Sequence, residues 1–82
     1  MKLYLVKVNE EISDGSFSER IICVASSKEN YEKAINEYIE EHSCGDEVII
    51  TRRKYDMKLE FSNKQEAYIW ISEMILDKIY DN

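Results

Sequence analysis

The sequence predicts a small α+β domain in which two helices pack mainly on one face of an antiparallel sheet of three to four strands. Two segments, Ser26–Asn30 and Ser62–Glu66, each follow an apolar run and carry the Ser-x-x-Glu/Gln spacing of a helix N-terminal capping box. Runs rich in β-branched and aromatic residues, which favour strands, precede both segments. The predicted element order is therefore ββαββα, with ββαβα as the alternative.

The length of 82 residues corresponds to a single domain spanning residues 1–82. A domain of this size buries only about 60% of the surface that its unfolded chain exposes, so we expect modest stability. The predicted element order also divides the domain into two ββα units, residues 1–45 and 46–82.

Residues 2–10 and 17–26 are predicted to form the first two strands, joined by a type I′ turn centred on Asp14 and Gly15. The face of this hairpin that we assign to the core then pairs Ile12 with Phe17, Val8 with Ile21, Val6 with Cys23 and Tyr4 with Ala25. The other face carries Leu3, Leu5, Ile22 and Val24. Because antiparallel sheets usually present one polar face to solvent, we expect a helix, a second protomer or a partner to cover this second apolar face.

The first helix is predicted over residues 27–43, followed by Gly45 as a left-handed cap. Its buried stripe shows the three-and-four spacing of a helix and consists of Tyr31, Ala34, Ile35, Tyr38 and Ile39. His42 lies in the last turn, where we expect it to interact with the helix dipole rather than to serve as a catalyst or metal ligand.

Residues 47–61 alternate apolar and polar side chains without a Gly, Pro or Asn to mark a turn. One long strand fits this alternation. Strands rarely exceed about ten residues, however, so a hairpin of strands 47–52 and 56–61, joined near residues 53–55, is favoured.

The second helix is predicted over residues 63–80 and differs from the first in having two apolar sides. Its far side carries Ile69, Leu76 and Tyr80. We expect these three residues either to mediate self-association or partner docking, or to pack between the sheet and the first helix. A homodimer and a monomer are equally compatible with this pattern.

The net charge of −6 is concentrated in the first part of the chain. Residues 1–50 hold 11 acidic and 5 basic side chains, whereas residues 51–82 hold 6 of each. The acidic face predicted for partner binding consists of Glu29, Glu37, Glu40 and Glu41. Such a surface favours basic partners and disfavours contact with phosphate backbones, although it also simply favours solubility.

No motif predicts an enzyme, a cofactor or a metal site. The two glycines, Gly15 and Gly45, belong to no phosphate-binding loop, and neither CxxC nor HExxH spacing occurs. Cys23 and Cys44 are expected to be free thiols, since a helix separates them. In the absence of a secretory signal or a long apolar run, we expect a cytoplasmic location and no membrane contact.

The function predicted on these grounds is that of a non-enzymatic acidic protein-binding module. One version, by analogy of size and charge alone, is an anti-CRISPR-like phage or mobile-element inhibitor that blocks a basic surface of a host protein. The alternative is a nucleic-acid-binding protein that uses the basic hairpin 52–58, with Arg52, Arg53, Lys54 and Tyr55 as contacts. The low pI of about 4.7 argues against this alternative.

Overall fold

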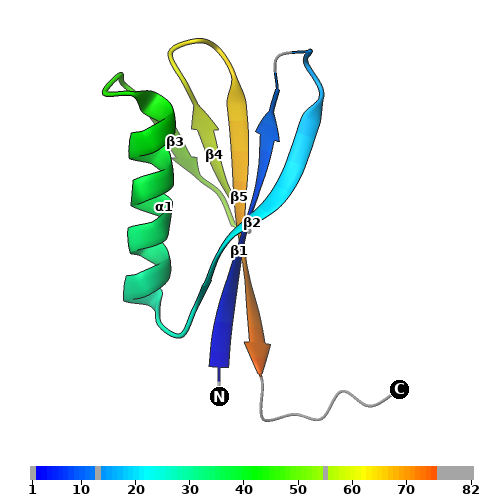
Figure 1. Ribbon diagram of the computed structural model, residues 1–82, viewed down its shortest axis with the longest axis vertical. Helices are drawn as coiled ribbons and strands as arrows, with labels where there is room; N and C mark the ends of the chain where they lie inside the picture. The colour runs from blue at the N-terminus through cyan, green and yellow to red at the C-terminus, as the bar shows by residue number, and fades with distance from the viewer. Residues whose placement is uncertain (1, 13, 55, 76–82) are drawn as a thin grey trace.

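The computed structural model describes residues 2–12, 14–54 and 56–75, which form a five-stranded sheet and one helix. In chain order the elements are β1 (Lys2–Glu11), β2 (Phe17–Ala25), α1 (Lys28–Ser43), β3 (Ile49–Arg52), β4 (Asp56–Glu60) and β5 (Glu66–Ile75). All neighbouring strands are antiparallel, in the spatial order β2-β1-β5-β4-β3. The helix therefore connects the two outer strands, and Figure 1 shows it running alongside the twisted sheet.

The core lies between α1 and the central strands. Ile35 and Tyr38 of the helix are 4% and 5% exposed, and they pack against strand residues that are almost fully buried. These strand residues are Val6, Val8, Met57, Leu59, Ala67 and Ile69. Because successive side chains of a strand point to opposite sides, the buried set defines one face of the sheet. We call it the helix face, and the opposite side the open face.

The predicted second helix is wrong, because residues 66–75 form the strand β5 between β1 and β4. The observed order is ββαβββ, so neither ββαββα nor ββαβα is correct, and the second ββα unit does not form. Along β5, Ala67 and Ile69 are buried on the helix face, while Tyr68 and Trp70 lie on the open face. A central strand with two apolar faces thus accounts for the pattern expected of a two-sided helix.

The segment that resembles a second capping box is the turn between β4 and β5. The Phe61 N–H donates to the Gln65 carbonyl at 3.0 Å, and the Lys64 N–H donates to the Phe61 carbonyl at 2.9 Å. Lys64 adopts a left-handed φ of 71°, and the Asn63 side chain accepts the Gln65 N–H at 3.0 Å. These contacts are typical of a short hairpin loop that ends in a left-handed residue.

The turn between β1 and β2 has the same hydrogen bonds. The Ile12 N–H donates to the Ser16 carbonyl at 2.8 Å, and the Gly15 N–H donates to the Ile12 carbonyl at 2.9 Å. Gly15, at φ 86°, occupies the left-handed position, and Asp14 Oδ1 accepts the Ser16 N–H at 2.9 Å. The loop closed by Ile12 and Ser16 is one residue longer than the predicted type I′ turn.

The longer loop shifts the hairpin register by one residue near the turn, so that Val8 pairs with Arg20 and Phe17 with Glu11. A β-bulge after Val6 shifts the register back. The predicted pairs of Val6 with Cys23 and of Tyr4 with Ala25 are therefore confirmed, whereas those of Val8 with Ile21 and of Ile12 with Phe17 are wrong.

The first helix is confirmed as α1, with a small change at its start. Ser27, rather than Ser26, is the N-cap, and its hydroxyl accepts the Asn30 N–H at 3.2 Å. Cys44, at φ 53°, takes the left-handed position after the last turn, and Gly45 follows with φ 86°. Cys23 and Cys44 are free thiols, as expected.

The favoured hairpin in residues 47–61 is confirmed as β3 and β4, which pair from Ile49 with Glu60 to Arg52 with Met57. β3 forms one edge of the sheet and β2 the other. Within the described part of the chain, no helix has the length and apolar character needed to cross a membrane.

Candidate binding surfaces

A polar cluster joins the end of α1 to the hairpin of β1 and β2. Glu10 is at its centre and uses both carboxylate oxygens. Oε1 accepts a hydrogen bond from Arg20 Nε at 2.9 Å, and Oε2 accepts one from the Tyr38 hydroxyl at 2.5 Å. His42 Nε2 lies 3.6 Å from Oε2, and the His42 ring stacks on Tyr38 with centroids 4.0 Å apart. The His42 Nδ1 is 2.9 Å from the Tyr38 carbonyl, so this histidine contacts the helix end as expected.

The pKa values in this cluster follow from these contacts. Burial acts to raise the pKa of Glu10, but the hydrogen bonds from Tyr38 and Arg20 outweigh it and hold the pKa below the ordinary value. Burial, reinforced by donation to Glu10, raises the pKa of the Tyr38 hydroxyl. Glu10 therefore stays ionised and Tyr38 stays protonated near neutral pH. The four groups satisfy one another and fix the helix on the sheet.

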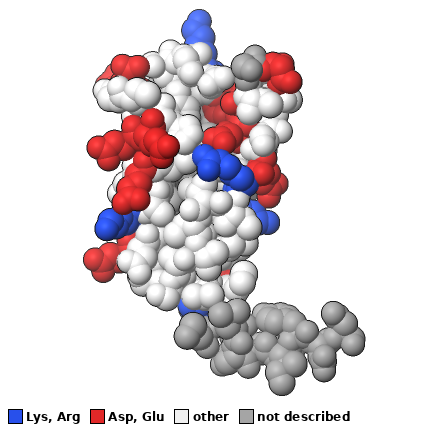
Figure 2. All heavy atoms as spheres, in the orientation of Figure 1, with Lys and Arg blue, Asp and Glu red and all other residues white. Residues whose placement is uncertain are grey.

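The four glutamates predicted to form the acidic face line two depressions beside α1. Glu29, Glu37 and Glu40 line one shallow depression on the outer side of α1, together with Glu32, Lys33 and two asparagines. Glu41 lies on the side facing β2, where it lines a second depression with Arg20 and with Glu37, which therefore borders both depressions. The pKa of Arg20 is raised mainly by its hydrogen bond to Glu10, with a smaller contribution from Glu41. Figure 2 shows acidic side chains along the side of the molecule where α1 lies.

The predicted basic contacts lie at the turn between β3 and β4. Arg52, Arg53 and Lys54 line a depression of about 350 Å³ whose floor includes Ile69 and Ile71. Arg53 is engaged within the protein: its Nε donates to Asp56 Oδ1 at 2.6 Å, and its guanidinium lies 5.2 Å from the Tyr68 ring centroid. Tyr55 falls outside the described residues.

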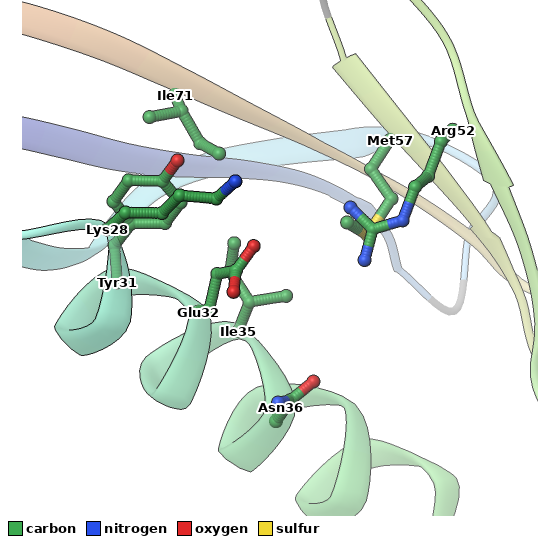
Figure 3. Close-up of a pocket in the computed structure, with 8 residues that line it drawn as sticks. All are labelled: Lys28, Tyr31, Glu32, Ile35, Asn36, Arg52, Met57 and Ile71. Atoms are coloured by element: carbon green, nitrogen blue, oxygen red, sulfur yellow. The ribbon is translucent and has the colours of Figure 1, made fainter.

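A groove of about 230 Å³ adjoins this depression, between α1 and the strands β3 to β5. It exists because α1 packs on the β1 and β2 side of the sheet and leaves the other strands of the helix face partly open. Figure 3 shows Lys28 and Arg52 projecting toward the groove from opposite walls, with Glu32 between them. Its apolar lining comes from Tyr31, Ile35, Met57 and Ile71. Charges of both signs thus surround a small apolar floor.

The open face carries an apolar patch near the end of the sheet where β1 begins and β5 ends. Its members on β1 and β5 alternate with residues of the helix face, and its members on β2 pair with open-face positions of β1. The open-face patch consists of Leu3, Leu5, Ile21, Val24, Trp70 and Met74. Ile21 and Val24 are 56% and 55% exposed, and no described element packs over the patch.

Ion pairs border the open-face patch toward the turns. Lys7 Nζ lies 3.7 Å from Glu19 Oε1, and Lys58 Nζ lies 3.0 Å from Glu66 Oε2. Phe17 and Tyr68 pack together on the same face, with ring centroids 6.0 Å apart. The open face thus has an apolar half and a half in which charges are paired within the protein.

Of the residues predicted for self-association, Ile69 is the one that the structure describes, and it does not belong to this patch. Ile69 is 1% exposed in the core, while Leu76 and Tyr80 lie outside the described residues. Of the second apolar face predicted for the first hairpin, Leu3, Leu5 and Val24 do lie on the open face, whereas Ile22 follows the bulge and packs toward the core.

Because residues 63–80 were predicted to form a helix, the position of Trp70 and Met74 on the open face of a sheet was not predicted. An alternating pattern in residues 66–75, with Ala67, Ile69 and Ile71 on one side, was the signal that could have placed them.

The described residues contain no group of three or more His, Cys, Asp or Glu side chains placed to hold a metal ion. Comparison with known proteins adds no further assignment. No protein-family model, curated protein or solved structure matches this chain.

Proposed function

We propose that the protein is a binding module for another protein and that its interface is the open-face patch, with the half-buried Trp70 at its border. One observation carries this proposal: an indole and several aliphatic side chains lie together on a sheet face that no described element covers. Apolar patches of this kind, rimmed by polar residues, mark interaction sites in folded proteins. The ion pairs of Lys7 with Glu19 and of Lys58 with Glu66 supply the polar rim.

Trp70 is expected to be the anchor of the interface. Tryptophan is enriched among the residues whose truncation costs about 2 kcal/mol or more in binding, because it buries a large rigid surface. Trp70 lies diagonal to Leu5 on the neighbouring strand, since Ser72 is the direct partner of Leu5, and the direct partners of Trp70 itself are Lys7 and Asp56. A shallow apolar surface flanked by aliphatic side chains fits an apolar ridge or helix on the partner.

The charge of the protein favours a partner with basic groups around its apolar surface. The net charge is −6, and the acidic side chains of α1 lie on the far side of the sheet from the open-face patch. These carboxylates would therefore raise the rate of encounter with a basic partner without touching it.

The test is affinity capture from a cell lysate with the wild-type chain and with Trp70→Ser, followed by titration of the captured protein. Trp70 is the only tryptophan, so its fluorescence reports directly on this face during the titration. We expect Trp70→Ser to weaken binding at least tenfold, with Glu37→Gln on α1 as the matched control that changes binding little. Binding that survives Trp70→Ser and is lost in a Glu37→Gln and Glu40→Gln double variant would contradict the proposal.

The alternative, nucleic-acid binding by the turn between β3 and β4, has less support. Asp56 neutralises Arg53, and Asp56 itself lines the depression that the basic residues share. This alternative predicts binding of single-stranded DNA or RNA at low salt that is lost in Arg52→Ala and unaffected by Trp70→Ser.

A further inference from the structure

The outer edge of β3 presents unpaired backbone groups. The Arg53 N–H donates to the Asp56 carbonyl at 2.9 Å, which makes these two residues a hydrogen-bonded pair. In an antiparallel ladder, hydrogen-bonded and non-hydrogen-bonded pairs alternate. From the pairing of Ile50 with Leu59 and of Arg52 with Met57, it follows that the N–H and C=O groups of Ile50 and Arg52 point away from β4. β3 is the last strand of the sheet, so no described strand takes up these groups.

The two edges of the sheet differ in protection. The other edge, β2, carries Glu19 and Arg20 and contains the extra residue of the bulge, Ile22, features that discourage the addition of another strand. β3 lacks them over its first three residues, and Ile49 and Ile50 are 63% and 45% exposed on opposite faces of the sheet. An exposed, apolar and unprotected edge is a template for a further strand.

The sequence around β3 is complementary to itself when it runs antiparallel. It reads Asp46-Glu47-Val48-Ile49-Ile50-Thr51-Arg52-Arg53-Lys54, with acidic residues before the apolar centre and basic residues after it. If Ile50 faces Ile50 of a second copy, Glu47 lies opposite Arg53 twice, whereas Asp46 and Lys54 lie in bends beyond the paired segment. A two-fold axis normal to the sheet permits this register, because each residue then faces one of the same orientation.

We propose that β3 pairs antiparallel with β3 of a second copy of this chain, centred on Ile50, so that the two sheets join edge to edge. The outward groups of Ile50 then form a hydrogen-bonded pair with their own counterparts, and those of Arg52 pair with Val48. Glu47 facing Arg53, whose guanidinium also binds Asp56 of its own chain, favours this register. This inference concerns a different surface from the open-face patch and does not depend on it.

Amide hydrogen exchange, measured residue by residue at several protein concentrations, tests the proposal directly. The N–H groups of Ile50 and Arg52 should exchange rapidly in dilute protein and at least tenfold more slowly in concentrated protein. Those of Ile49 and Thr51, which point toward β4, should be protected equally at both concentrations and serve as the internal control. Light scattering should show the mass rising toward twice that of the monomer over the same range.

Two variants separate the edge from other surfaces. Ile50→Pro removes an outward N–H and leaves the β3–β4 ladder intact, so it should abolish the dimer while the fold persists. Glu47→Lys should weaken the dimer at least tenfold at low salt without altering the backbone, whereas Glu37→Lys, the same charge change on α1, should not. A protein that stays monomeric at all concentrations would overturn the proposal. So would a dimer that survives both edge variants, or one that only Trp70→Ser dissociates.

Discussion

Two segments of this chain share a sequence pattern and have different structures. Ser26–Asn30 leads into α1, with Ser27 as its cap, whereas Ser62–Glu66 is the hairpin turn between β4 and β5. Both begin with a small polar residue and carry an acid or amide three positions later, and both follow an apolar strand. The capping pattern therefore indicates a local turn, and it does not determine whether a helix or a strand follows.

The residues after each segment determine whether a helix or a strand forms. After Ser27, the residues Tyr31, Ile35 and Tyr38 recur at three-and-four spacing and pack on the sheet. After Ser62, burial recurs at every second residue, at Ala67 and Ile69. Alternation places one set of side chains in the core and leaves the other on the open face, which only a strand can do.

The largest expected effect comes from breaking this alternation. Ile69→Ala removes a side chain that is 1% exposed, and we expect it to lower the free energy of unfolding by about 2–5 kcal/mol. Ser72→Ala, at an exposed position of the same strand, should change it by less than about 0.5 kcal/mol. Chemical denaturation measures both, and equal effects would contradict the buried and exposed positions of β5.

A second prediction concerns the polar cluster around Glu10, which joins α1 to the hairpin of β1 and β2. Glu10→Gln replaces the carboxylate that binds Tyr38 and Arg20, and we expect a loss of about 1–3 kcal/mol at neutral pH. The pKa of Glu10 is lower in the folded chain than its ordinary 4.5. The contribution of Glu10 is therefore fully present above pH 4.5 and is lost as the pH falls through the folded pKa. Denaturation curves from pH 7 to pH 3 should converge for the two proteins, and a constant difference would argue against this role.

The two serines themselves offer a smaller and more direct comparison. Ser27→Ala removes the acceptor for the Asn30 N–H at the start of α1 and should cost about 1 kcal/mol. Ser62 donates to Asp46 Oδ2 at 3.0 Å on the exposed surface and caps no helix, so Ser62→Ala should cost about 0.5 kcal/mol or less. Similar losses from both substitutions, measured by thermal and urea unfolding, would indicate that Ser62 has a capping role after all.

The last expected effect is a gain in stability. Lys64 holds the left-handed position in the second hairpin loop that Gly15 holds in the first, and this conformation costs a residue other than glycine about 1 kcal/mol. Lys64→Gly should therefore stabilise the protein by up to about 1 kcal/mol, after the extra freedom of glycine in the unfolded chain is subtracted. Gly15→Ala should destabilise it by a similar amount, and a loss of stability in Lys64→Gly would contradict the shared loop geometry.

Much of the first half of the chain was predictable from sequence because its signals are local. The three-and-four spacing from Tyr31 to Ile39 fixed α1, and the pairing of Val6 with Cys23 followed from the apolar alternation of two adjacent strands. The bulge that corrects the register was not predictable. The longer loop shifts the register by one residue and the bulge shifts it back, so the apolar pattern far from the turn is unchanged.

The prediction for the second half of the chain was wrong where the structure depends on residues distant in sequence. β5 is a strand because it lies between β1 and β4, which cover its backbone on both edges. A segment that is apolar on both sides reads as either element until its neighbours are known. The open-face patch was only half predictable for the same reason: Leu3, Leu5 and Val24 lie in one hairpin, whereas Trp70 joins them from the other end of the sequence.

The pairing of β1 with β5 also bears on how the chain folds. Lys2 pairs with Ile75 and Glu10 with Ala67, so the centre of the sheet joins residues from nearly opposite ends of the described chain. Closing so long a loop costs entropy before any contact between these strands compensates for it, and sheets rich in such distant pairs fold slowly. On a ribosome, β1 is synthesised long before β5, its partner at the centre of the sheet. Until β5 is synthesised, both edges of the first hairpin are open to other strands.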